Sequence, residues 1–339
     1  MNKNNIAIAV ACAFSTTAVS AATVYQDDAT TFNVGGRAEV RANFSDANKD
    51  PDTGDSSYAD ASRVRLSVDG TQVVSNDLSF FGKYEFEIKE AEDGSSDDVK
   101  WNTRYLYAGI ETSRGNLYYG HQTNAVTYLT DWTDLAETFS GYINEYTVAT
   151  ADRAKNVLRY EIATDNGITF QIDGNFNSDS ESAQSDGYGA VLAYGLPVGV
   201  ELGIGYASSD ETYGNGTDTD TSDAVFVGAK YSNDNGLYLA ALYQGGSISK
   251  LGIKGSDYNA VDTYIGYAFD DNNVDLTYSY FSADDIAALD INFIGVEYAR
   301  YIGGVALFAS YKFNLLDEGE GGEGDNDEDE LMLGLRYGF

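Results

Sequence analysis

Apolar and polar residues alternate with a period of two along much of the chain. Over residues 32–44 an apolar face that runs from Phe32 to Phe44 opposes a face that carries Arg37, Glu39 and Arg41. The same alternation returns at 62–71 and at 79–89. A half-buried β-strand has this period, both in a soluble sandwich and in a membrane barrel. The pattern therefore predicts strands but leaves open what their apolar face contacts.

The connections between these strands favour a barrel. Seven short turn signals alternate with eight longer polar stretches, so fifteen connections would join sixteen strands. The turns lie at 76–77, 113–116, 165–167, 196–197, 233–236, 270–273 and 303–304. The polar stretches are 45–59, 90–99, 123–150, 178–186, 209–222, 246–256, 283–288 and 315–330. Bacterial outer-membrane barrels have short periplasmic turns and long extracellular loops. We therefore expect an all-β, 16-stranded antiparallel transmembrane β-barrel that forms one domain over 22–339.

The first residues have the pattern of a cleaved signal peptide over 1–21. Lys3 precedes a short apolar segment, 6–14, and Val19-Ser20-Ala21 supplies a small-x-small cleavage site. Attachment of a lipid to Cys12 is the weaker alternative, because Ala9 stands where such sites usually have Leu or Val. Cys12 is the one cysteine, so the mature chain would contain no disulfide. No apolar run reaches the roughly 18 residues of a membrane helix.

Charge and composition exclude several functions. The chain has 20 basic and 54 acidic residues, a net charge of -34. Loss of 1–21 removes only Lys3 among them, which leaves 19 against 54, or -35. Such a field repels nucleic acid. His121 is the single histidine, and no Gly-x-Ser-x-Gly motif accompanies it. We expect neither an enzyme nor a cofactor or metal.

Four segments of the chain resemble the general diffusion porins of Gram-negative bacteria, nearest the OmpU/OmpL-like porins of marine Vibrio relatives. They are Phe32-Asn-Val-Gly-Gly-Arg-Ala-Glu-Val-Arg41, Asn102-Thr-Arg-Tyr-Leu-Tyr-Ala-Gly109, Leu117-Tyr-Tyr-Gly120 and the terminal Arg336-Tyr-Gly-Phe339. The resemblance implies a homotrimer in the outer membrane, in contact with its lipids and lipopolysaccharide, whose pores are narrowed by an inward-folded third loop. It also implies an assembly signal, Leu335, Tyr337 and Phe339, that the barrel-assembly machinery recognises.

The third loop, expected over 123–150, has an internal pattern of its own. Trp132, Leu135, Ala136 and Phe139 are spaced as the apolar stripe of a short helix that would dock on the barrel wall. Asp131, Asp134 and Glu137 would then face the pore. The alternative is that Asp131 and Asp134 only cap the first turn of that helix. Enterobacterial porins carry Pro-Glu-Phe-Gly-Gly-Asp in this loop, a motif that is absent here, so the pore width does not follow from the resemblance.

Basic residues are concentrated on the early strands, and the resemblance implies that they face the acidic loop. The predicted basic side of the constriction comprises Arg37, Arg41, Arg63, Arg65, Lys83, Arg104 and Arg159. Arg104 shares the lumen face only if Tyr105 and Tyr107 meet lipid. The alternative is that these bases are paired with Glu39, Asp69, Glu85 and Glu87.

These features predict a water-filled channel for passive diffusion of ions and small hydrophilic solutes, with a mild cation preference. One alternative is a sugar-selective porin that uses Tyr128, Trp132, Phe139 and Tyr142 as a track, and another is a non-conducting structural or adhesive barrel. Asp46, Asn48, Asp50 and Asp52 form a weak calcium candidate. A solvated loop is the favoured interpretation there, as it is for the acidic run 317–330.

Overall fold

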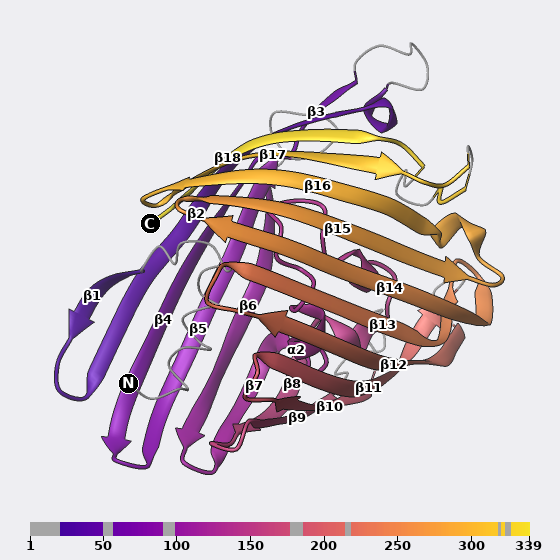
Figure 1. The fold of residues 1–339 in the computed structure, drawn as a ribbon. Coiled ribbons are helices and arrows are strands. Elements are labelled where there is room, and N and C mark those ends of the chain that lie inside the picture. Colours follow the sequence, from indigo (N-terminus) through magenta and orange to yellow (C-terminus); the bar gives the residue numbers. More distant parts are fainter. Residues whose placement is uncertain are drawn as a thin grey trace.

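The chain forms a closed antiparallel β-barrel in a computed structural model that describes residues 21–49, 57–90, 99–176, 186–213, 218–317, 320–322 and 327–339. The sheet has 18 strands. Sixteen of them form the wall, and two short ones, β1 and β3, are added to it. Each wall strand pairs with its neighbours in the sequence, and pairing between the last strand and β2 closes the ring (Figure 1). The predicted 16-stranded antiparallel barrel is confirmed.

The wall strands have 8 to 17 residues. In chain order they are β2 (Thr30–Ser45), β4 (Arg63–Ser75), β5 (Leu78–Glu90), β6 (Val99–Thr112), β7 (Gly115–Thr123), β8 (Arg153–Ala163), β9 (Ile168–Asn175), β10 (Gly187–Gly195), β11 (Val200–Tyr213), β12 (Asp218–Ser232), β13 (Leu237–Lys250), β14 (Ile253–Phe269), β15 (Asn272–Ala283), β16 (Ile291–Ile302), β17 (Val305–Asn314) and β18 (Glu330–Gly338). The additions are β1 (Ala22–Gln26) and β3 (Tyr58–Asp60), both paired with β2. Among the described residues, no helix is long and apolar enough to cross a membrane.

The apolar residues divide between two surfaces. One set is exposed on the outside of the wall, where side chains such as Val40, Leu106 and Ile204 are more than half exposed. A lipid-facing barrel surface has this character. A second set lies inside the ring, on the inner face of β10 to β17, and is buried under the segment between β7 and β8. The hydrophobic core of this protein therefore lies within its own barrel.

All seven predicted short turns are found, but two predicted loops are wrong. Strand pairing continues through most of 209–222, and through 246–256 except at Leu251 and Gly252. Both of those residues have positive φ, 50° and 81°, as a two-residue I′ hairpin turn requires. The flanking residues are polar and resemble a loop in sequence. Backbone pairing does not need apolar side chains, so the hairpins extend beyond the apolar band.

Candidate functional site

The segment between β7 and β8, residues 124–152, lies inside the ring of strands, and we call it the third loop (Figure 1). It contains the short helix α2 (Thr127–Thr130) and two 3-10 turns, η2 (Tyr142–Asn144) and η3 (Ala149–Ala151). The helix expected over 131–139 is wrong. The Ser140 hydroxyl donates to the Asp134 carboxylate and accepts from the Ala136 amide, and such local side-chain bonds compete with helix formation.

The apolar residues of the third loop nevertheless dock on the wall as expected. Trp132 is 3% exposed and Phe139 is 4% exposed. Wall glycines make room for both residues: a Cβ on Gly203 would meet the Trp132 ring, and one on Gly295 would meet the Cβ and carbonyl oxygen of Phe139. Trp132 and Phe139 therefore cannot form the sugar track considered from the sequence, because their faces do not reach the lumen.

Four acidic residues of the inner wall hold the third loop by its backbone. We call Asp173 (β9), Glu211 (β11), Asp262 (β14) and Glu297 (β16) the wall carboxylates. Each accepts a hydrogen bond from a loop amide: Asp173 from Ala125 (2.6 Å), Glu211 from Ala149 (2.6 Å), Asp262 from Ile143 (3.0 Å) and Glu297 from Glu137 (2.8 Å). Their spacing along the loop fixes it from end to end.

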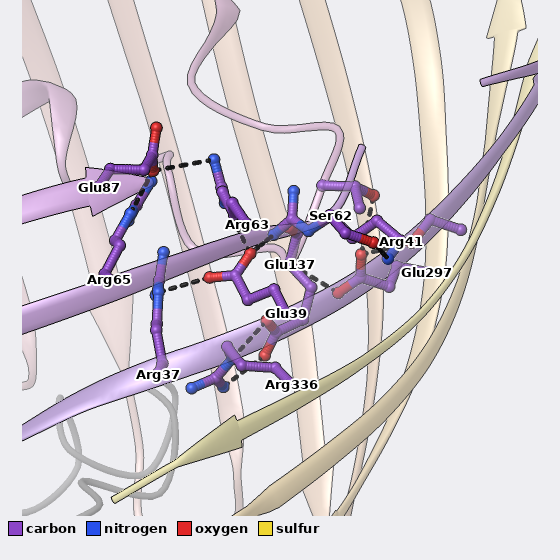
Figure 2. A network of polar contacts seen from close by, with 12 residues as sticks. Arg37, Glu39, Arg41, Ser62, Arg63, Arg65, Glu87, Glu137, Glu297 and Arg336 are labelled. Atoms are coloured by element: carbon purple, nitrogen blue, oxygen red, sulfur yellow. Dashed lines mark hydrogen bonds and ion pairs between the residues drawn. The ribbon is translucent and has the colours of Figure 1, made fainter. Parts of the chain in front are cut away.

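The opposite wall, on β2 to β6, carries the predicted basic residues except Arg159, which lies on β8, and they are paired with acids; Figure 2 shows the pairs of Arg37, Arg41, Arg63 and Arg65. Glu39, whose side chain is fully buried, forms ion pairs with Arg37, Arg41 and Arg63. Glu87 pairs with Arg65 and lies near Arg63 and Arg104, and Glu85 pairs with Lys83 (3.1 Å) and Arg104 (3.0 Å). We call this group the basic ladder. Its side chains keep contact with solvent, since Arg63 is 24% and Lys83 is 31% exposed.

Two of the three predicted acids of the third loop, Asp131 and Asp134, face the lumen. The side chains of Asp131 and Asp134 are exposed, as expected for residues facing a wet lumen. Asp131 lies within electrostatic range of Arg153 and Arg159, and Asp134 within range of Arg65. Arg159 itself is fixed by bonds to the carbonyl and hydroxyl of Thr123.

Glu137 departs from the prediction that it faces the pore with Asp131 and Asp134. Arg336, on the last strand, binds its carboxylate through two nitrogens at 2.7 and 2.8 Å, and both side chains are 5% exposed. Arg41 of the basic ladder donates to the Glu137 carbonyl at 2.7 Å (Figure 2). Glu137 is therefore the point at which the tip of the loop is fastened to the wall.

A register shift in β6 changes which residues reach the lumen. The pairing between β5 and β6 skips one residue between Glu85 and Phe86, so Arg104 is accommodated in a bulge. Both Arg104 and its neighbour Tyr105 lie beside Glu85 and Lys83. The expectation that Arg104 faces the lumen only if Tyr105 and Tyr107 meet lipid is wrong.

The calcium candidate is only partly described by the structure. Asp46 forms an ion pair with Lys49 (2.7 Å), and Asn48 donates to Asn43. Asp50 and Asp52 lie outside the described residues, as does the predicted leader apart from Ala21. No group of three potential metal ligands occurs in the part of the chain that the structure describes.

Comparison with known proteins identifies the family. The family model for Gram-negative porins matches residues 7–339. The chain belongs to the Gram-negative porin family. Porin-like protein L of Photobacterium profundum is 33% identical and outer membrane protein U of Vibrio parahaemolyticus is 30% identical, each over all of both chains. The resemblance noted in the sequence is confirmed. This is an outer-membrane porin, a channel and not an enzyme.

Solved porin structures share the fold. OmpF of Salmonella typhi, in a complex with daunomycin, superimposes with a TM-score of 0.80 at 24% identity and covers 94% of this chain and all of its own. The anion-selective porin of Comamonas acidovorans gives a TM-score of 0.72 at 18% identity, with 91% of this chain covered and all of its own.

The four wall carboxylates, which hold the third loop, were not singled out in the sequence. Arg336 was noted there only in the terminal segment that carries the resemblance, and its bond to the third loop was not predicted. The sequence of β16 could have indicated one of the wall carboxylates. Glu297 is a lone acid between Val296 and Tyr298, and the alternation along the strand places it on the inner face. In a strand that is apolar on both faces, an isolated charge on the lumen side marks a partner inside the barrel.

Proposed function

We propose that this porin forms a water-filled channel through which ions and small hydrophilic solutes diffuse passively, with a mild preference for cations. The observation that carries the proposal is the placement of exposed Asp131 and Asp134 inside the barrel, within electrostatic range of bases on β4 and β8. This arrangement gives a transverse field across the lumen. Side chains that line a pore select solutes by size and charge.

The sign of the preference follows from which charges remain unbalanced. Glu39, Glu85 and Glu87 neutralise part of the basic ladder. The loop acids Asp131 and Asp134 and the strongly acidic chain as a whole act in the other direction. The Debye length is about 8 Å at physiological salt, so charges at the constriction outweigh those at the mouth, and a strong preference is not expected.

The first prediction tests the acidic side of the constriction. The double variant Asp131→Asn and Asp134→Asn should shift the zero-current potential toward anions in a planar bilayer under a salt gradient. Replacement of Arg37 and Arg65 by Ala should raise conductance and cation preference. Unchanged selectivity in both variants would mean that these residues do not line the constriction, and absence of any conductance would favour the non-conducting barrel.

We also propose that three copies assemble as a trimer. A solved structure of OmpT from Vibrio cholerae, 17% identical to this chain, is a trimer form. Apolar side chains on the outer face of β2 to β6 offer surface for such contacts as well as for lipid. Cross-linking of the protein in native outer membranes tests the assembly.

A further inference from the structure

Aromatic side chains gather on the lumen face of β5, β6 and β7, where a porin wall is usually polar. Phe81, Tyr105, Tyr107 and Tyr118 are each partly exposed and form a continuous group, which we call the aromatic strip. Ring centroids lie 5.0 Å apart for Phe81 and Tyr118, 5.8 Å for Tyr107 and Tyr118, and 6.0 Å for Tyr105 and Tyr107. The strip extends from the short-turn end of the wall up to the basic ladder.

The lumen orientation of the strip follows from strand pairing. Tyr107 pairs directly with Lys83, and Tyr118 pairs directly with Arg159. The neighbouring residues point to the opposite side: Phe80 is 47% exposed and Tyr119 is 55% exposed on the outer face. Phe81 and Tyr118 thus each have an adjacent aromatic residue on the outer face.

Two features shape the strip. Gly109 lies beneath Phe81, since a Cβ there would come within 2.6 Å of the ring. The Phe81 ring therefore packs against the backbone of the wall at Gly109 and borders the lumen. The rings meet at interplanar angles of 62° to 83°, the edge-to-face arrangement that aromatic pairs favour. A further planar ring can extend the same packing against Phe81 and Tyr107.

Cations lie along the strip. The Lys83 ammonium is 4.7 Å from the centre of the Tyr105 ring, and the Arg159 guanidinium is 4.6 Å from that of Tyr118. Lys83 has three N–H donors and is 31% exposed, so donors remain beyond its pair with Glu85. Because cations cover one face of Tyr105 and one of Tyr118, a sugar finds few free ring faces for stacking, whereas an anionic group finds donors.

We propose that the aromatic strip is a binding subsite for small aromatic carboxylates on their way through the channel. The ring of the solute packs against Phe81 and Tyr107, and its carboxylate accepts hydrogen bonds from Lys83. The proposal rests on the proposed function, because it requires that solutes reach the lumen. The ligand is an anion, whereas the channel is proposed to prefer cations mildly. The subsite would therefore retain a class of solute that the constriction does not favour.

Single-channel recording with 2-naphthoate tests the subsite. We expect a saturable reduction of the potassium chloride current, with cyclohexanecarboxylate weaker by about two- to tenfold, the range that one aromatic pair supplies. Phe81→Leu and Tyr107→Leu should each weaken the 2-naphthoate effect by a similar factor. The matched controls Phe80→Leu and Tyr119→Leu alter the lipid face and should leave it unchanged.

Two further measurements test the role of the Lys83 charge and detect binding independently of the current. Lys83→Gln should weaken the effect of 2-naphthoate but not that of neutral 2-naphthalenemethanol. Saturation-transfer NMR of 2-naphthoate with the intact barrel in detergent reports binding even if no current flows. Equal block in Phe81→Leu and Phe80→Leu would show that the rings only support the wall, and stronger block by maltotriose would assign the strip to sugars. Either result overturns the proposal of an aromatic-carboxylate subsite. If the potassium chloride conductance is normal in the same experiment, the proposed function as a diffusion channel still stands.

Discussion

At the scale of single residues, the partners of a charge decide its role more than its place in a local pattern. Asp131, Asp134 and Glu137 share a spacing of three residues, and the sequence therefore groups them on one face. The structure separates them because Arg336, 199 positions later in the chain, binds Glu137. No local pattern contains that partner, so this part of the site was not predictable from the loop alone.

Replacement of Glu137 by Gln should weaken the loop anchor and change selectivity little. The amide loses the charge that faces Arg336 in a buried position, which we expect to cost about 2 kcal/mol. The temperature at which the barrel unfolds, followed by its shift in gel mobility, should fall. Glu145→Gln, at an exposed acid of the same loop, is the control. A shift of zero-current potential as large as that of Asp131→Asn would instead place Glu137 in the constriction.

At the scale of elements, alternation predicted β2, β4 and β5 with the correct face inward, since regular pairing preserves parity. It failed at β6, because a bulge changes parity and carries no residue signature there. The spacing of Trp132 and Phe139 predicted burial correctly but the wrong backbone. A loop that is pinned by amide bonds to the wall can bury an apolar stripe without forming a helix.

The wall carboxylates should govern how firmly the third loop is held. Asp262→Ala removes the acceptor of the Ile143 amide in a buried position, and an unpaired buried amide costs about 1 to 3 kcal/mol. We expect a noisier open-channel current with more frequent partial closures. Asp257→Ala, at an exposed position of the same strand, should leave the current trace as it is. If the open-channel current of Asp262→Ala is no noisier than that of the unchanged protein, the other three wall carboxylates are enough to hold the third loop in place.

At the scale of the whole molecule, the barrel has two unlike halves. The basic residues concentrated before residue 160 predicted a charged wall on β2 to β8. The apolar inner face of β10 to β17 was not predicted, because Phe226, Leu242 and Phe281 were not distinguished from the lipid-facing residues beside them. When both faces of a strand are apolar, the alternation of residues does not show which face points into the barrel. The third loop fits between the halves, covers the apolar one and leaves the charged one in contact with solvent.

The last residue of the chain adds two backbone hydrogen bonds to the closure of the ring. The Phe339 amide donates to the Gly36 carbonyl at 3.0 Å, and the Gly36 amide donates to the Phe339 carbonyl at 2.8 Å, next to the pairing of β18 with β2. Phe339 thus has a backbone role in addition to the aromatic ring that resembles an assembly signal. The two roles can be separated, because a side-chain substitution keeps the backbone bonds.

Deletion of Phe339 should therefore impair folding in detergent as well as assembly in cells, because it removes both backbone bonds to Gly36 beside the β18–β2 pairing. Phe339→Ala should fold normally from urea into detergent and yet show reduced assembly in the outer membrane, since only the ring is lost. Heat-modifiable gel mobility measures folding in both settings, and Tyr337→Phe, which keeps an aromatic ring in the same strand, is the control. Normal assembly of Phe339→Ala in cells would show that the ring is no part of the signal, and normal refolding of the deletion would show that β18 closes the barrel without its last residue.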